Sequence, residues 1–373
     1  MLDCLVVGGG IIGLAVADRL VTLGRDVSIV DHFPLRHQQQ DGARTSSIAA
    51  GGILPPPISR ATYDPLEQIR TLSDNLFSDW VRELELATGI KCDYRVCGGL
   101  YIARTIGEEI SLNASADEWK RDGVELEQVS IELLDTLEPQ IDFSNVRNAF
   151  RLPAEQLVHP ASLVKALRQR SHDNGVKLET SGSAVRLELN ADHAVAVVDR
   201  NSLSAREIIV AGGPWTTELL LPFGFDVGVE PRRGQIVKWQ LPDHAIQHVV
   251  NEGPRYVFCR ADGELIAGST VEEVEFDCRT TDDGIGTLVE FAESLVPQIR
   301  DRKPVETWAG LRPFSRDGVP SIGRVAGVTN LTVATGHFRS GIHLAPATAL
   351  LICQLLSSQS PAIDMKPFEV RRN

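Results

Sequence analysis

The chain has 373 residues, of which 43% are hydrophobic and 23% are charged, as in an ordinary globular protein. Its formal net charge of -13 disfavours binding to nucleic acid, because no basic cluster offsets it locally. The longest apolar stretches fall well short of the roughly 20 residues that span a bilayer, and the first residues do not have the pattern of a signal peptide. We therefore expect a cytoplasmic protein without a membrane span.

Neither the cysteines nor the histidines are spaced as metal ligands. The six cysteines include no C-x-x-C pair, and the nine histidines show no H-E-x-x-H arrangement. We expect free thiols, no disulfide framework and no metal site.

The first half of the chain has the pattern of a parallel α/β sheet. Residues 2–7, 11–23 and 26–30 are predicted to form a strand, a helix and a strand in succession. Further helices are predicted over residues 64–88, 114–122 and 159–174. Further strands are predicted over residues 98–103, 177–198 and 206–210. The last of these is nearly continuous in apolar residues, as buried parallel strands are.

The pattern changes between about residues 227 and 322, where short strand-like runs separated by Gly, Asp and Pro indicate an antiparallel sheet. These runs cover residues 235–239, 256–260 and 264–267, and one helix is predicted over 283–296. A final strand over 331–334 and a helix over 344–356, after Gly341, are expected to return to the first sheet. The first domain is therefore predicted to be discontinuous.

A glycine-rich loop follows the first strand. Gly8-Gly9-Gly10-Ile11-Ile12-Gly13 fits G-x-G-x-x-G and opens the first helix. Gly8 permits the tight turn, Gly10 lets the backbone approach a pyrophosphate, and Gly13 allows close packing of helix on strand. The second strand leads to Asp31, whose carboxylate is placed to accept hydrogen bonds from ribose hydroxyls. This arrangement predicts a dinucleotide site.

A run of small and hydroxyl residues, from Arg44 to Leu54, indicates which dinucleotide binds. Small side chains in this run let the backbone lie against a flat ring system, which favours FAD. No second G-x-G-x-x-G is present for a separate NAD site.

At this point the sequence resembles the D-amino-acid oxidase family of flavoproteins, and within it the glycine oxidase branch of thiamine biosynthesis. The similarity covers essentially the whole chain, and it rests on blocks at residues 6–13, 45–54, 211–215, 233–235, 308–313 and 335–342. The two most specific blocks are Trp308-Ala309-Gly310-Leu311-Arg312-Pro313 and Thr335-Gly336-His337-Phe338-Arg339-Ser340-Gly341-Ile342.

The resemblance implies roles for particular residues. Arg312, in a loop before Pro313, would bind the substrate carboxylate, with Tyr256 on its other side and Arg339 near the flavin ring. The implied FAD contacts, beside Gly8, Gly10, Gly13 and Asp31, are Ile12, Thr45, Ser46, Ala50, Gly51, Gly52, Val185, Gly336, His337, Arg339, Ser340, Gly341 and Ile342. Related sarcosine oxidases attach their flavin through a cysteine, but residues 309–323 contain none, so we expect noncovalent FAD. Phe314 and His343 replace a small and an aliphatic residue, which affects the expected pocket size.

The fold class predicted is α/β, with an FAD-binding Rossmann-like parallel-sheet domain and a second, mainly antiparallel β substrate domain. Residues 1–88, 147–224 and 322–373 are assigned to the FAD domain, and residues 89–146 and 225–321 to the substrate domain. The expected partners are a small amino acid and oxygen or another electron acceptor, and a homo-oligomer is possible. Two alternatives stay open, namely a dehydrogenase that passes electrons to a quinone or protein, and a noncatalytic FAD-binding subunit.

Overall fold

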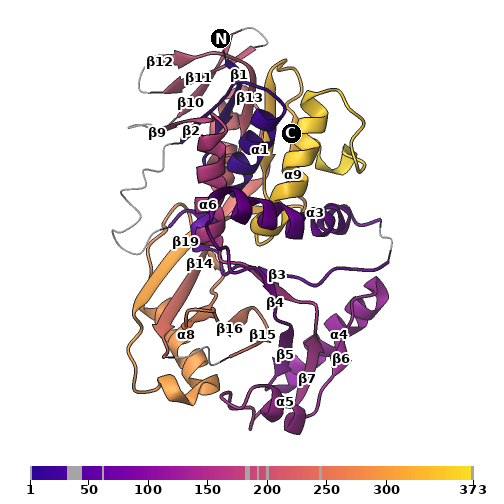
Figure 1. Ribbon diagram of the computed structural model, residues 1–373, viewed down its shortest axis with the longest axis vertical. Helices are drawn as coiled ribbons and strands as arrows, with labels where there is room; N and C mark the ends of the chain where they lie inside the picture. Colours follow the sequence, from indigo (N-terminus) through magenta and orange to yellow (C-terminus); the bar gives the residue numbers. More distant parts are fainter. Residues whose placement is uncertain are drawn as a thin grey trace.

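The computed structural model describes residues 2–31, 44–60, 63–180, 185–190, 193–198, 201–242 and 246–370. Figure 1 shows a lobe with a parallel sheet at the top, where both termini lie, and a lobe with an antiparallel sheet at the bottom. The predicted fold class, a parallel α/β unit joined to a mainly antiparallel one, is confirmed. The residue boundaries assigned to the two domains stay a prediction.

The upper lobe contains a six-stranded sheet of order β20-β21-β13-β1-β2-β9. Its strands are β1 Leu2–Val7, β2 Val27–Asp31, β9 Lys177–Thr180, β13 Ala205–Val210, β20 Ser321–Arg324 and β21 Leu331–Thr335. All neighbouring pairs are parallel except β20 with β21. Most residues of β1 are buried, and so is the apolar end of β13, for which the sequence predicted a buried parallel strand.

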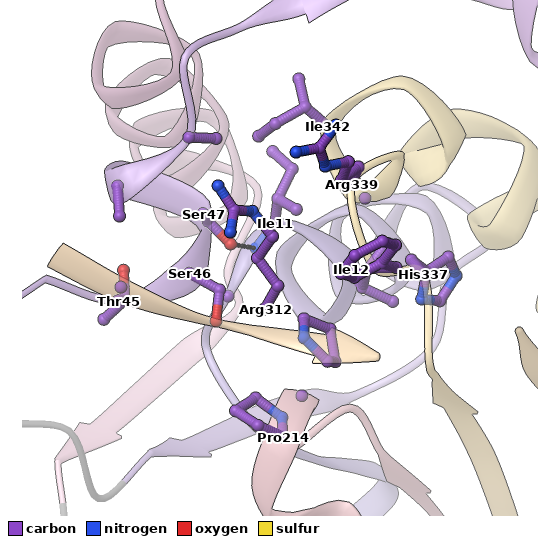
Figure 2. A pocket seen from close by; sticks show the side chains of 18 of the residues that line it. Ile11, Ile12, Thr45, Ser46, Ser47, Pro214, Arg312, His337, Arg339 and Ile342 are labelled. Carbon is purple, nitrogen blue, oxygen red and sulfur yellow. Dashed lines mark hydrogen bonds between the residues drawn. The ribbon is translucent and has the colours of Figure 1, made fainter. Parts of the chain in front are cut away.

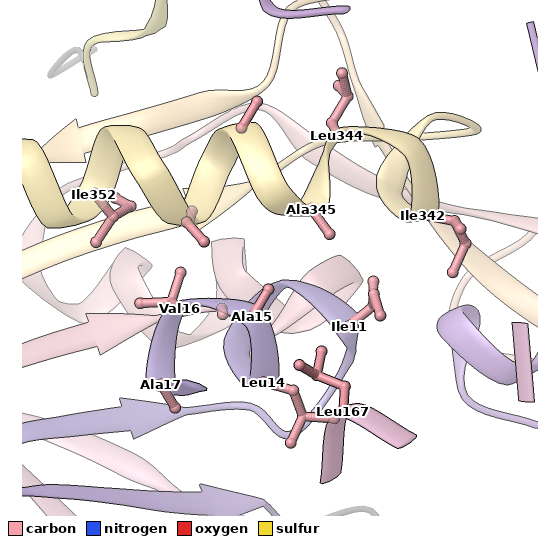
Figure 3. Close-up of a cluster of buried hydrophobic side chains, with 14 of the residues drawn as sticks. Ile11, Leu14, Ala15, Val16, Ala17, Leu167, Ile342, Leu344, Ala345 and Ile352 are labelled. Carbon is pink, nitrogen blue, oxygen red and sulfur yellow. The ribbon is translucent and has the colours of Figure 1, made fainter. Parts of the chain in front are cut away.

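Helices α1 Ile11–Thr22 and α9 Gly341–Leu356 pack on this sheet, and α3 Pro65–Thr88 and α6 Pro160–Asp173 pack on these two helices. Figure 3 shows α1 packed along α9, with Ala15 and Val16 facing the side of α9 that carries Ala345 and Ile352. Ile11 and Ile342, in the first turns of the two helices, lie at the same end of this packed pair. Helix α9 begins three residues before the predicted start at 344, and its first turn is already packed into the core.

The lower lobe is built on a nine-stranded sheet of order β18-β14-β17-β16-β15-β5-β7-β6, with β19 paired to β14. Its strands are β5 Gly99–Ala103, β6 Glu127–Gln128, β7 Asn148–Leu152, β14 Val229–Gln240, β15 Val249–Glu252, β16 Arg255–Cys259, β17 Glu264–Gly268, β18 Glu272–Glu273 and β19 Glu306–Ser315. Only the β15–β5 pair among them is parallel. Two stretches that are distant in the sequence, residues 99–152 and 229–315, therefore form one sheet.

Three helices accompany this sheet, α4 Ile106–Asp122, α5 Ile131–Leu137 and α8 Asp282–Leu295. Helix α4 begins eight residues before the predicted start at 114, because Thr105 and Glu108 form a capping box that fixes its first turn. The sequence reading missed the short helix α5. None of the described helices is long and apolar enough to cross a bilayer.

The remaining elements are short. They are α2 Ser46–Ala49, α7 Thr216–Leu220, β3 Ile53–Leu54, β4 Arg95–Val96, β8 Gln156–Leu157, β10 Arg186–Asn190, β11 His193–Val198 and β12 Asn201–Leu203, with 3-10 turns at Gly213–Trp215, Leu221–Phe223, Pro297–Ile299 and Lys366–Phe368. Helix α2 and strand β3 carry the small-residue run from the glycine-rich loop toward the antiparallel sheet.

Candidate functional site

A cavity of about 940 Å³ is lined by residues of both lobes. From the parallel sheet come the ends of β1, β2, β13 and β21 with the loops that follow them, and from the antiparallel sheet come residues of β14, β15, β16 and β19. Apart from Gly13 and Gly336, every site residue predicted from the sequence lines this cavity: Gly8, Gly10, Ile12, Asp31, Thr45, Ser46, Ala50, Gly51, Gly52, Val185, Tyr256, Arg312, His337, Arg339, Ser340, Gly341 and Ile342.

The glycine-rich loop forms one end of the cavity, and its geometry requires glycine. Gly8 has φ +114°, and a Cβ atom there would lie 2.3 Å from the carbonyl oxygen of Ala211. A Cβ atom on Gly13 would lie 1.9 Å from the carbonyl oxygen of Gly8. Gly13 therefore lies behind the loop, where it packs α1 against β1, and Gly8 and Gly10 present backbone to the cavity.

The N-terminus of α1 is open toward a ligand, because its cap residue Gly10 offers no side-chain hydrogen bond. The N–H of Gly9 donates to Asp31 Oδ2 at 3.0 Å, which fixes the carboxylate beside the loop. The N–H of Ile11 donates to Ser47 Oγ at 2.9 Å. The sequence analysis predicted Ser46 as a contact of FAD and missed Ser47. The hydroxyl of Ser46 donates to the backbone carbonyl of Leu311. Nothing in a run of adjacent hydroxyl residues distinguishes these two in advance.

The small-residue run forms the floor of the cavity. A Cβ atom on Gly51 would lie 2.5 Å from the Tyr256 hydroxyl, and one on Gly52 would lie 2.0 Å from the carbonyl oxygen of Val158. Buried Arg260 donates to the carbonyl of Gly51 at 3.0 Å, and Trp308 Nε1 donates to that of Ala49 at 3.1 Å. The floor therefore consists of backbone that Arg260 and Trp308 fix through hydrogen bonds. A surface without side chains suits a planar ring.

The opposite wall is the start of α9. The hydroxyl of the cap residue Ser340 accepts a hydrogen bond from Arg70 and does not cap the helix. The first turn contains no acidic residue, so the N–H groups of α9 present a positive end to the cavity. Burial lowers the pKa of His337 to about 3, so its ring is neutral, and its Nε2 lies 3.0 Å from Thr348 Oγ1. Gly336, with φ +80°, turns the chain behind this wall and does not line the cavity.

These features fit FAD. Two uncapped helix N-termini, a loop of glycines that admits no side chain, a carboxylate at the end of β2 and a flat backbone floor meet in one cavity. None of the six cysteines is among the residues that line it.

Arg312 lies in β19, so the prediction that it occupies a loop is wrong. Pro313 suggested a loop because proline cannot donate a ladder hydrogen bond. Among the described strands, however, β19 pairs only with β14, where Pro313 lies opposite Pro231, and an edge strand tolerates proline. Figure 2 shows the side chain of Arg312 rising from β19 into the cavity that Arg339 enters from the loop before α9.

The guanidinium of Arg312 is anchored only by neutral groups. Its Nη1 donates to the carbonyl of Thr270 at 3.0 Å and to that of Arg233 at 3.3 Å, and its Nη2 donates to Ser269 Oγ at 2.8 Å. Among the described residues, no carboxylate oxygen lies within ion-pair distance of Arg312 or Arg339. Burial and then the charge of Arg339 lower the pKa of Arg312 to about 10, so the group is still a cation at neutral pH.

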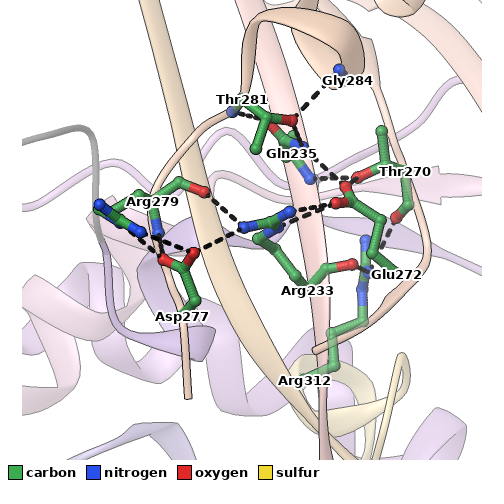
Figure 4. A network of polar contacts seen from close by, with 9 residues as sticks. All are labelled: Arg233, Gln235, Thr270, Glu272, Asp277, Arg279, Thr281, Gly284 and Arg312. Carbon is green, nitrogen blue, oxygen red and sulfur yellow. Dashed lines mark hydrogen bonds and ion pairs between the residues drawn. The ribbon is translucent and has the colours of Figure 1, made fainter. Parts of the chain in front are cut away.

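A polar network holds the backbone groups that anchor Arg312 (Figure 4). Arg233 Nε donates to Glu272 Oε2 at 3.0 Å, and Gln235 Nε2 donates to Glu272 Oε1 at 2.7 Å. The N–H of Gln235 donates to Thr270 Oγ1 at 3.0 Å. Burial opposes ionisation of Glu272, but its hydrogen bonds with Arg233, Thr270 and Gln235 hold its pKa below the ordinary value. In this network Glu272 forms its ion pair with Arg233 and not with Arg312. The side of the Arg312 guanidinium that faces the cavity is therefore left for a ligand.

Tyr256 lies on β16 beside Arg312. Burial raises the pKa of Tyr256, although the charge of Arg312 and a hydrogen bond with Ser269 oppose the shift, so its hydroxyl keeps a proton to donate. The phenol also lies against Gly268, where a Cβ atom would be 2.6 Å from the hydroxyl oxygen. A hydroxyl donor and a guanidinium thus converge on the same part of the cavity.

The two residues expected to alter the pocket differ in position. Phe314 does not line the cavity, and its ring packs edge-on against Phe338 at 5.1 Å between centroids. His343 does line it, with Nε2 at 2.7 Å from Asp74 Oδ1.

Several residues that line the cavity were missed by the sequence reading. Among them are Arg70, Tyr101, Glu155 and Asn251. Their segments reach the cavity through strand pairing and helix packing between distant parts of the chain. No short motif marks them in the sequence.

Comparisons with known proteins agree with this geometry. Residues 3–355 match the profile of a family described as FAD dependent oxidoreductase. The chain is 30% identical to a glycine oxidase of Pseudomonas aeruginosa, with 97% of each protein aligned. It is 31% identical to a bifunctional ThiO/ThiG protein of Nostoc sp., with 100% of this chain aligned to 55% of that protein. Its structure matches the crystal structure of glycine oxidase from Geobacillus kaustophilus with a TM-score of 0.89 at 27% identity, covering 100% of this chain and 99% of that one.

Proposed function

Because the chain belongs to the family of FAD-dependent oxidoreductases that matches residues 3–355, we propose that it oxidises the carbon–nitrogen bond of glycine or another small amino acid. Similarity to glycine oxidases along nearly the whole chain supports this reaction. The likeness to the bifunctional ThiO/ThiG protein supports a place in thiamine biosynthesis.

The observation that carries the proposal is the guanidinium of Arg312. Its three hydrogen bonds, to Arg233, Thr270 and Ser269, use at most three of its five N–H donors, so two are free for a ligand. A largely desolvated cation without a carboxylate partner is costly, and binding an anion offsets that cost. A planar guanidinium binds a carboxylate through two parallel hydrogen bonds, which fixes the orientation of the substrate as well as its position.

The neighbouring groups complete the recognition of an α-amino acid. The protonated hydroxyl of Tyr256 donates to the same carboxylate, and Arg339 adds positive charge from the opposite wall. With the carboxylate fixed, the α-carbon is held toward the floor formed by Ala50 and Gly51. No basic side chain is assigned to remove the amine proton, since the ring of His337 is buried and bonded to Thr348, and we propose that the substrate amine arrives neutral.

The residues proposed to hold FAD divide along its length. Gly8, Gly10 and the N-terminus of α1 would take the pyrophosphate, Asp31 the ribose, and the α9 N-terminus the pyrimidine edge of the flavin. When bound, FAD supplies the acceptor for the hydride that leaves the α-carbon. The protein contributes by excluding water from this region and by placing positive charge from α9 where the ring gains negative charge.

Oxygen is the electron acceptor that we propose, with hydrogen peroxide and an imine as products. The test is to incubate FAD-loaded protein with glycine and a panel of small amino acids in air, measuring peroxide and ammonia together. Equal amounts of the two products are expected. Turnover with an artificial electron acceptor but not with oxygen would replace the oxidase by a dehydrogenase, and absence of any turnover would favour a noncatalytic FAD-binding protein.

A further inference from the structure

A row of side chains crosses the antiparallel sheet beneath the cavity. Tyr101 on β5 is paired with Asn251 on β15, Asn251 with Tyr256 on β16, and Tyr256 with Gly268 on β17. Residues that lie opposite each other on neighbouring strands point to the same face of a sheet. Tyr101, Asn251 and Tyr256 accordingly all line the cavity. At one end of the row, Ser269 next to Gly268 accepts a hydrogen bond from the Arg312 guanidinium. At the other end, Asn251 belongs to a second cluster of polar side chains.

That second group is centred on Glu155, which is fully buried. Tyr101 donates its hydroxyl proton to Glu155 Oε2, and Asn251 Nδ2 donates to Glu155 Oε1 at 3.0 Å. Among the described residues, no cationic side chain lies within ion-pair distance of this carboxyl. Burial raises the pKa of Glu155 to about 7, as is expected of a carboxyl without a cationic partner.

The hydrogen bond to Glu155 determines which end of the Asn251 amide faces the cavity. A carboxylate accepts hydrogen bonds, so the NH₂ group of Asn251 is turned toward it. The carbonyl oxygen Oδ1 is left as the cavity-facing end, and no hydrogen bond to it is found in the described part of the chain. This end of the cavity thus offers hydrogen-bond acceptors, whereas the other end holds the cations Arg312 and Arg339.

The separation of the strands that carry the two ends disfavours a contact with the α-amine. Strands β17 and β15 are two strand spacings apart, about 10 Å between backbones, whereas the carboxylate and the amine of an α-amino acid are joined through one carbon. A group that reaches Asn251 while the carboxylate is on Arg312 must lie on the side chain or on an N-substituent.

We propose that Asn251, oriented by Glu155, is a specificity-determining residue that accepts a hydrogen bond from an ammonium, amide or hydroxyl group on the far end of the substrate. The preferred substrates are then small amino acids whose side chain or N-substituent carries such a donor. The proposal rests on the proposed function, because it takes the carboxylate to be bound by Arg312.

The test uses two carboxylates of equal size that have no α-amine, 5-aminopentanoate and hexanoate. Their dissociation constants for the FAD-loaded protein are measured by titration calorimetry, so no turnover is needed. Wild type is expected to bind 5-aminopentanoate at least fivefold more tightly than hexanoate. A smaller ratio, or tighter binding of hexanoate, overturns the proposal.

Two variants then locate the preference. Asn251→Leu removes the acceptor, and Asn148→Leu is the matched control, since each asparagine is 8% exposed in the same sheet. Asn148 bonds to Asn113 and Gln128 outside the cavity. The ratio of the dissociation constant of hexanoate to that of 5-aminopentanoate is expected to be at least fivefold lower in Asn251→Leu than in Asn148→Leu. A smaller difference contradicts the assignment. If Asn251→Leu does not retain FAD, Asn251→Ala is measured in its place by the same criterion.

Failure of this inference can be separated from failure of the proposed function. If both carboxylates bind equally and Arg312→Ala abolishes the binding of both, the carboxylate site stands and only the role of Asn251 is wrong. If Arg312→Ala leaves both affinities unchanged, the carboxylate site and the inference built on it are both wrong.

Discussion

The guanidinium of Arg312 lies directly against Gly234 of the neighbouring strand. A Cβ atom on Gly234 would fall 2.1 Å from Nη2 and 2.2 Å from Nη1 of Arg312, which is inside the space that the guanidinium occupies. Gly234 lies two residues along β14 from Arg232, the pairing partner of Arg312, so the side chain leans diagonally across the strand pair. The orientation of Arg312 in the cavity thus depends on the absence of a side chain at Gly234.

Gly234→Ala should therefore displace the guanidinium while the FAD site is left intact. We expect KM for the amino-acid substrate to rise at least tenfold, because Arg312 no longer meets the carboxylate in its bidentate geometry. The FAD content of the purified variant, measured from the released flavin, should equal that of wild type. Gly286→Ala is the control, since a Cβ atom at this position in α8 meets nothing within 4 Å. Unchanged kinetics in Gly234→Ala would show that Arg312 does not bind the substrate from this position.

Asp31 should contribute to the affinity for FAD. Its carboxylate is fixed by the N–H of Gly9, and charged hydrogen bonds to ribose hydroxyls contribute about 1.5–3 kcal/mol. Asp31→Ala is expected to raise the dissociation constant of FAD by about ten- to a hundredfold, measured by fluorescence titration of the apoprotein. Asp26→Ala, an exposed position just before β2, should leave it unchanged. Equal weakening by both substitutions would point to a loss of stability instead of a lost contact.

The buried carboxyl of Glu155 should make stability depend on pH. Its folded-state pKa of about 7 lies above the ordinary 4.5, so the folded chain keeps a proton that the unfolded chain releases. This contribution to stability is fully present below pH 4.5 and is lost as the pH rises through about 7, at a cost of roughly 3 kcal/mol. Glu155→Gln removes the titration. Urea unfolding should show the variant gaining about 2–3 kcal/mol relative to wild type between pH 5 and pH 8. A difference that is constant with pH, or that shrinks, contradicts the prediction.

The part of the fold around the glycine-rich loop could be predicted from sequence because its contacts are local. Strand β1, the loop and α1 are consecutive, and Asp31 follows at the end of the next strand. Periodicity within that stretch is sufficient to place the glycines and the carboxylate together.

The substrate side of the cavity was less accessible to sequence reasoning. Arg312 was predicted by resemblance, but its place in an edge strand depends on the pairing of β19 with β14, which no local pattern specifies. Asn251 and Glu155 are 96 residues apart and meet only once β15 pairs with β5. Their residue types, an amide and a carboxylate, do not differ in sequence from those of structural polar groups.

Arg312 itself can be tested with matched substitutions. Removing one partner of a buried ion pair costs about 3–5 kcal/mol, so Arg312→Ala should lower kcat/KM by about two to four orders of magnitude. Arg312→Lys should recover only part of this loss, because an ammonium cannot form two parallel hydrogen bonds with the carboxylate. FAD content is the control in both variants. Activity of Arg312→Ala within about threefold of wild type would shift the assignment to Arg339.

Carboxylate-dependent oxidation is tested most directly by anaerobic mixing of the FAD-loaded protein with glycine and, separately, with methylamine, which has the amine but no carboxylate. The rate of loss of the oxidised flavin absorbance is followed in wild type and in Arg312→Ala. We expect glycine to reduce the flavin of wild type at least a hundredfold faster than methylamine does, and we expect this difference to disappear in Arg312→Ala. Equal rates with the two compounds in wild type, or a preference for glycine that survives in Arg312→Ala, would contradict this expectation.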